Sequence, residues 1–118
     1  MEVEERRAHP RIPIGFGALV HYGDTKVAAA TRDMSLGGCL LESETQIPEA
    51  TEVGIALYVT IDGIDADLPP LKVMGTTRWS AEGESDGDVV YFSGVQFQGL
   101  NEPQTKWLAD VLRRYGQD

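Results

Sequence analysis

Short segments in which apolar and polar side chains alternate are the feature that most constrains the fold of this chain. In residues 53–61, every second side chain from Val53 to Ile61 is apolar, which is the period of a β-strand with one buried face. Five further segments read as strands: 14–22, 25–32, 39–42, 71–79 and 89–97. The sequence therefore predicts about six or seven short strands.

The alternation also predicts which side chains share a face. Counting by twos along 71–79 places Trp79 with Leu71 on one face and Arg78 on the other. The same count along 89–97 places Val89 and Phe97 on one face. We expect the apolar faces to line the interior.

Turn residues separate these strands. Gly23-Asp24 and Asp62-Gly63 are hairpin signals, and residues 33–38 read as a turn. The polar stretch 45–52 reads as a loop, and the acidic stretch 81–88 as the mobile tip of a hairpin.

One helix, over residues 101–115, ends the chain. Asn101 is a good N-cap, and Gln104 stands at the position that completes a capping box. An apolar stripe follows at helical spacing: Trp107, Leu108, Val111, Leu112 and Tyr115. Short strands followed by one helix predict an all-β antiparallel barrel or strongly rolled sheet, with the helix over one mouth or edge.

Length and composition bound the remaining possibilities. At 118 residues the chain is expected to form one domain over residues 13–118, preceded by a flexible, arginine-bearing arm over residues 1–12. No apolar run approaches the roughly 20 residues of a membrane span, and the acidic N-terminus is unlike a secretory signal. Cys39 is the only cysteine, so no internal disulfide forms, and we expect a cytoplasmic protein as monomer or homodimer.

Basic residues are concentrated in one place on an acidic chain. The formal net charge is −9, which argues against a partner as large and anionic as DNA or RNA. Arg6, Arg7 and Arg11 nevertheless lie close together. A guanidinium group presents a planar fork of donors that matches phosphate oxygens or the O6/N7 edge of guanine. The cluster therefore favours a small anionic ligand.

A second group of residues complements these arginines. Asp33 offers a carboxylate that can accept hydrogen bonds from the N1–H and N2–H₂ groups of guanine, and Ser35 can donate or accept. Gly37 and Gly38 permit positive φ and let a ligand approach the backbone closely. Asp33 and Ser35 could also simply close the turn through bonds to the backbone.

The two groups together resemble the motifs of the PilZ domain, the bacterial receptor module for cyclic di-GMP. Arg7 and Arg11 match Arg-x-x-x-Arg, and Asp33, Ser35 and Gly38 match Asp-x-Ser-x-x-Gly. The resemblance extends to the Arg-Trp end of residues 75–79 and to the Gly-Val-x-Phe segment at 94–97, and so covers nearly the whole chain.

The resemblance implies a six-stranded antiparallel barrel with a C-terminal α-helix, binding cyclic di-GMP and no other cofactor. Arg7 and Arg11 would hold phosphates and guanine edges, Asp33 and Ser35 would read a guanine, and Gly38 would keep the turn open. Arg6 would help to capture a second ligand molecule. Composition favours Trp79 and Trp107 as core or interface anchors over base-stacking residues. Of the two, Trp79 is the candidate for a place near the ligand, because its strand resembles one that flanks the family's binding face.

Three functional alternatives follow. The first is a receptor that changes the conformation of its arm on binding nucleotide and signals to a protein partner in motility, secretion or regulation. The second is a PilZ-type protein interaction module that needs no nucleotide, and the third is an oligonucleotide binder, which the net charge disfavours. No nucleophile–base set is readable, so we expect no enzyme and no metal site.

Overall fold

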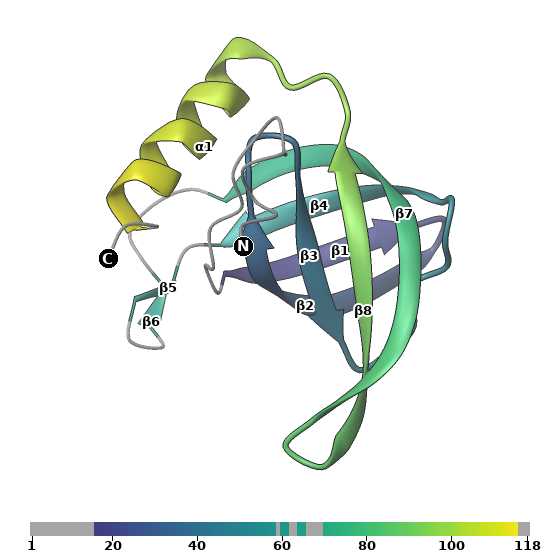
Figure 1. Ribbon diagram of the computed structural model, residues 1–118. Helices are drawn as coiled ribbons and strands as arrows, with labels where there is room; N and C mark the ends of the chain where they lie inside the picture. The colour runs from purple at the N-terminus through teal and green to yellow at the C-terminus, as the bar shows by residue number, and fades with distance from the viewer. Residues whose placement is uncertain (1–15, 59, 62–63, 66–69, 116–118) are drawn as a thin grey trace, which may run out of the picture.

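The computed structural model describes residues 16–58, 60–61, 64–65 and 70–115. Six antiparallel strands close into a barrel in the order β1-β2-β3-β8-β7-β4 (Figure 1). Their bounds are β1 Gly17–Tyr22, β2 Thr25–Met34, β3 Gly38–Ser43, β4 Glu52–Tyr58, β7 Leu71–Ser85 and β8 Asp88–Phe97. The all-β, six-stranded barrel is thus confirmed.

The predicted long strand at 53–61 is two strands. Strand β4 ends at Tyr58, and Thr60–Ile61 (β5) pairs instead with Ile64–Asp65 (β6) as a separate two-stranded sheet. This small sheet lies outside the barrel wall (Figure 1). The predicted Asp62-Gly63 turn lies outside the described residues, as does the predicted arm.

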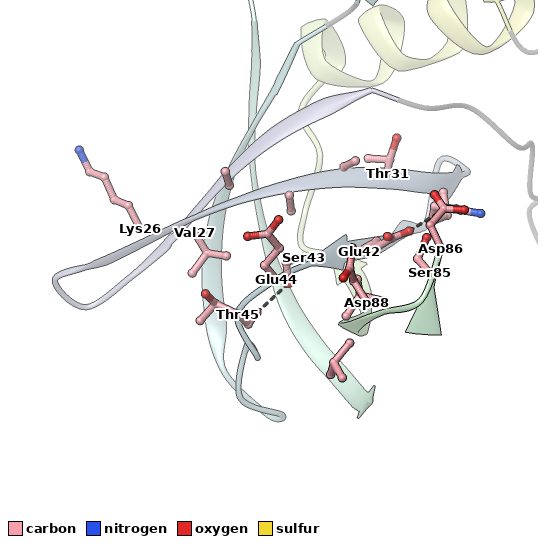
Figure 2. A pocket seen from close by; sticks show the side chains of 16 residues that line it. Lys26, Val27, Thr31, Glu42, Ser43, Glu44, Thr45, Ser85, Asp86 and Asp88 are labelled. Atoms are coloured by element: carbon pink, nitrogen blue, oxygen red, sulfur yellow. Dashed lines mark hydrogen bonds and ion pairs between the residues drawn. The ribbon is translucent and has the colours of Figure 1, made fainter. Parts of the chain in front are cut away.

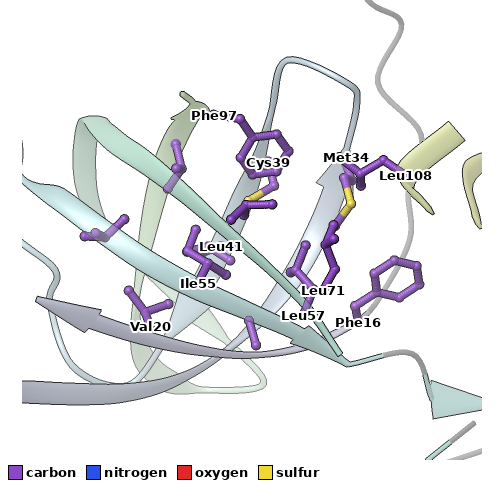
Figure 3. Packing of buried hydrophobic residues seen from close by; sticks show 14 of the residues in the cluster. Phe16, Val20, Met34, Cys39, Leu41, Ile55, Leu57, Leu71, Phe97 and Leu108 are labelled. Carbon is purple, nitrogen blue, oxygen red and sulfur yellow. The ribbon is translucent and has the colours of Figure 1, made fainter. Parts of the chain in front are cut away.

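The barrel interior is filled by the alternating faces of the strands. Within β4, Val53, Ile55 and Leu57 are all buried, as their spacing predicts. The core continues with side chains from the other strands, the β3–β4 loop and the helix, among them Phe16, Val20, Met34, Leu41, Ile47, Leu71, Val95, Phe97 and Leu108 (Figure 3). Cys39 is one of these buried side chains, so this thiol packs as a small apolar group.

Strand β7 departs from simple alternation, and here one prediction was wrong. Its pairing with β8 shifts register between Thr77 and Trp79, so Arg78 is an extra residue in a β-bulge. Leu71 and Thr77 face the core, whereas Trp79 is 40% exposed. Trp79 therefore lies on the outer face, opposite to Leu71, because the bulge reverses the alternation.

The acidic stretch 81–88 is also different from the prediction. Residues up to Ser85 continue β7 and pair with the start of β8, so only Asp86 and Gly87 form the turn. Both have positive φ, the geometry that Asp-Gly gives to a two-residue hairpin. This hairpin extends past the barrel (Figure 1). Near its end Val90 is buried, whereas Val89, which shares its alternation with Phe97, is 53% exposed.

Helix α1 (Glu102–Tyr115) closes one end of the barrel (Figure 1). The predicted capping box is present: the Gln104 N–H donates to Asn101 Oδ1 at 2.8 Å, and the Asn101 N–H donates to Gln104 Oε1 at 2.8 Å. Leu108, Val111 and Leu112 are buried in the core cluster. Burying three such side chains stabilises the docked helix by several kcal/mol, on the order of 1.5–3 kcal/mol each.

Candidate functional site

Four residues form one row across the outer face of the barrel. Asp33 on β2 pairs with Leu40 on β3, Leu40 pairs with Gly94 on β8, and Gly94 pairs with Trp79 on β7. Side chains directly opposite in antiparallel strands project from the same face. The row spans three intervals between strands, about 14 Å along the sheet. Asp33 and Trp79, which are far apart in sequence, therefore lie at the two ends of one row on the outer face.

Trp79 lies directly over the glycine in this row. A Cβ on Gly94 would be 2.2 Å from Trp79 Nε1 and 2.6 Å from its Cε2. The absence of a side chain at Gly94 therefore lets the indole lie across β8, toward Leu40. A partly exposed indole in this position offers an apolar plate on which a purine can stack.

The Asp-x-Ser-x-x-Gly segment is built differently from the prediction that residues 33–38 form a turn. Asp33 and Met34 belong to β2, so the turn comprises only the residues between Met34 and Gly38. The Ser35 N–H donates to the Gly38 carbonyl at 2.9 Å, and the Gly37 N–H donates to Ser35 Oγ at 3.1 Å. Ser35 is buried, so its hydroxyl closes the turn as an acceptor and keeps its own proton to donate.

The two glycines of this segment do not use the positive φ that glycine permits. Among the described glycines, positive φ occurs at Gly23, Gly87 and Gly99, and not at Gly37 or Gly38. A Cβ on Gly38 would instead lie 2.1 Å from the Val95 carbonyl oxygen. Gly38 is therefore required for the close approach of β3 to β8, and its role is packing rather than unusual backbone conformation.

Two arginines of the barrel wall flank the row, and sequence reasoning did not include either in the site. Arg32 Nη1 lies 2.6 Å from Glu42 Oε1 in an ion pair. The Arg78 Nε–H donates to Gln96 Oε1 at 2.7 Å. Each follows a buried threonine and precedes a residue of the row. Arg78 was noted only as part of the Arg-Trp segment of the family resemblance, and no motif marked Arg32; the bulge at each position is visible only in the strand register.

A hollow of about 1320 Å³ lies beside this surface, between β2, β3 and the β7–β8 hairpin (Figure 2). Its lining includes Arg32 and Glu42 but not Asp33, Ser35, Gly38 or Trp79. Four carboxylates line it, from Glu42, Glu44, Asp86 and Asp88, against two cations, Lys26 and Arg32. That balance repels an anionic ligand, so the row is the better candidate for a phosphate-bearing one.

The remaining predicted site residues, Arg6, Arg7 and Arg11, lie outside the described residues. Within the described part of the chain, no group of three or more histidine, cysteine or acidic side chains is arranged to hold a metal ion. Over the same residues, no helix has the length and apolar character needed to span a bilayer.

Comparison with known families decides the identity of the fold. The profile of the family described as PilZ domain matches residues 5–115. The chain belongs to the PilZ domain family. The PilZ match includes both segments that carry the sequence motifs, the arginine cluster and Asp33–Gly38. No curated protein sequence matches this PilZ chain.

Solved structures share this PilZ fold at low sequence identity. The PilZ domain of YcgR from Escherichia coli, solved with c-di-GMP, superposes with a TM-score of 0.74 at 14% identity, covering 92% of this chain and 89% of that one. The MrkH–c-di-GMP complex of K. pneumonia gives 0.71 at 16%, covering 92% of this chain and 51% of that one. PlzA of Borreliella burgdorferi, in complex with c-di-GMP, gives 0.58 at 10%, covering 92% and 52%. The chain thus spans about half the length of the latter two.

Proposed function

We propose that this PilZ protein is a receptor for cyclic di-GMP. The observation that carries the proposal is the row from Asp33 to Trp79. A carboxylate lies at one end of this row and an exposed indole at the other, and Gly94 leaves room for the indole. A guanine needs an acceptor for its N1–H and N2–H₂ donors and a flat apolar surface for its ring. The carboxylate of Asp33 and the indole of Trp79 provide these two groups about 14 Å apart along the sheet. Each purine of one ligand could therefore bind at a different end of the row.

The structural relatives support the identity of the ligand. YcgR, MrkH and PlzA are described as complexes with c-di-GMP, and this chain has both sequence motifs of such receptors. Arg7 and Arg11 supply the planar donors that phosphates and guanine edges require. Arg6 would help to bind a second ligand molecule. We assign Ser35 mainly to closing the turn and Gly38 to the β3–β8 contact.

Isothermal titration calorimetry with cyclic di-GMP tests this function, with GMP as the control ligand. Arg7→Ala and Asp33→Ala should each weaken binding by about 10- to 100-fold, because charge-assisted hydrogen bonds contribute on the order of 1.5–3 kcal/mol. Their melting temperatures should stay close to that of the parent. Arg113→Ala is the matched control, since Arg113 is an exposed helix arginine paired with Asp110. Absence of heat with tens of micromolar ligand on folded protein would refute the proposal.

The receptor acts by conformational change and not by catalysis. We propose that the N-terminal segment carrying Arg7 and Arg11 closes over the nucleotide, and that a protein partner recognises the new surface. Hydrogen exchange should then slow in residues 1–12 when ligand is added, and chromatography should recover the nucleotide unchanged. A pull-down that retains the same partner with and without nucleotide would favour the nucleotide-independent interaction module.

A further inference from the structure

Two strands of the barrel each contain one extra residue, and both extra residues are arginines. The β2–β3 register shifts between Thr31 and Asp33, which makes Arg32 the inserted residue. The β7–β8 register shifts between Thr77 and Trp79, which inserts Arg78. Both threonines are buried. A bulge places two successive residues on the same side of a strand, so each arginine projects outward beside a residue of the row.

The two bulges flank the row at opposite ends. Arg32 adjoins Asp33 on β2, and Arg78 adjoins Trp79 on β7, with β3 and β8 between them. The two guanidinium groups are too far apart to share one phosphate, because the strands that carry them are about 14 Å apart along the sheet. Each would therefore meet a different part of any ligand that covers the row.

The partners of the two arginines differ in charge. Arg32 pairs with the carboxylate of Glu42 at 2.6 Å, a contact whose charges largely cancel. Arg78 donates through Nε to the neutral carboxamide of Gln96 at 2.7 Å. Among the described residues, no acidic side chain forms an ion pair with Arg78. In the described part of the chain, no carboxylate therefore compensates the positive charge of Arg78. One hydrogen bond orients its side chain, and the N–H donors of both Nη atoms remain available to a ligand.

We propose that Arg78 is a ligand-binding residue of this site, oriented by Gln96, and that Arg32 is not. The inference rests on the proposed function and extends it to a guanidinium group fixed on the barrel wall. Next to Trp79, the free edge of Arg78 can take a planar pair of acceptors, such as the O6/N7 edge of a stacked guanine or two oxygens of one phosphate. The acceptor pair belongs to the same cyclic di-GMP molecule that Asp33 contacts at the other end of the row.

Calorimetric titration of cyclic di-GMP into the full chain tests this assignment. Arg78→Ala should weaken binding by about 10- to 100-fold, the loss expected for one charge-assisted bidentate contact. Arg78→Lys should recover little, because an ammonium group lacks the planar fork. Arg32→Ala is the matched control, an exposed arginine from the other bulge, and should change affinity by less than about threefold if Glu42 already neutralises it.

Gln96→Glu isolates the charge of Arg78 without removing it. The added carboxylate would give Arg78 the same kind of partner as Arg32 has, so affinity should fall severalfold while the melting temperature stays within a few degrees. Parent-like binding by Arg78→Ala and by Gln96→Glu, in a protein that itself binds cyclic di-GMP, would overturn the assignment. Absence of binding by the parent would refute the receptor function, and this assignment with it.

Discussion

Replacement of Gly38 by alanine is the sharpest test of how the motif segment is built. The new Cβ would lie 2.1 Å from the Val95 carbonyl oxygen, about 1.3 Å short of ordinary contact, which begins at 3.4 Å. The obstacle is backbone and cannot rotate away, so β3 and β8 must separate at this point. A 2.9 Å hydrogen bond does not survive such a displacement.

Two hydrogen bonds depend on this contact. The Phe97 N–H donates to the Gly37 carbonyl and the Ser35 N–H donates to the Gly38 carbonyl, both at 2.9 Å. Losing both costs about 2–3 kcal/mol, and the reduced freedom of the unfolded chain returns roughly 0.4–1 kcal/mol of this. The net loss of about 2 kcal/mol lowers the melting temperature by roughly 5–10 °C for a domain of this size.

Thermal and urea unfolding, followed by circular dichroism, measure this loss directly. Gly17→Ala is the matched control, because a Cβ on Gly17 in β1 meets nothing within 4 Å. We expect the control to unfold at or slightly above the parent temperature. If Gly38→Ala melts within about 2 °C of the parent, the close approach of β3 to β8 is not what requires glycine here.

Three further predictions address other parts of the barrel. Gly94→Ala should displace the indole of Trp79 by more than 1 Å, since the new Cβ would lie 2.2 Å from Trp79 Nε1. In a Trp107→Phe background, where Trp79 is the remaining tryptophan, the fluorescence maximum should shift with little change in melting temperature. An unchanged spectrum would contradict the placement of the indole over Gly94. Thr77→Val removes buried hydrogen bonds that anchor the β3–β4 loop. Its free energy of unfolding, measured by urea denaturation, should be about 2 kcal/mol lower than that of the parent. A loss below 0.5 kcal/mol would mean that other contacts hold the loop. Asn101→Ala removes the helix cap and should cost about 1 kcal/mol in the same assay, and a stability equal to the parent's would refute the capping role.

The architecture could be predicted because it follows from local rules. The alternation in β4 and the apolar stripe of α1 both report burial directly, so the strand and helix assignments from them are confirmed. The capping box was predicted correctly because it depends on two side chains three residues apart. Such features need no knowledge of distant contacts.

The features that the sequence did not reveal depend on pairing between strands. A bulge is an event in the register of two strands, and the arginine at each bulge carries no mark of it, so counting by twos placed Trp79 on the wrong face. Residues 81–85 look like a polar loop but join a strand, because backbone pairing with β8 is indifferent to their side chains. The role of Gly38 was missed since its reason, the Val95 carbonyl, lies 57 positions along the chain.

Each bulge adds one residue to the outside of the barrel without changing the face on which the residues before and after it lie. Deleting Arg78 would restore strict alternation, with Thr77 facing inward and Trp79 still facing outward opposite Gly94. Deleting Arg32 would likewise leave Asp33 opposite Leu40 at the other end of the row. The two extra residues therefore add a guanidinium group beside each end of the row, while the carboxylate of Asp33 and the indole of Trp79 keep the face that the strand pairing gives them.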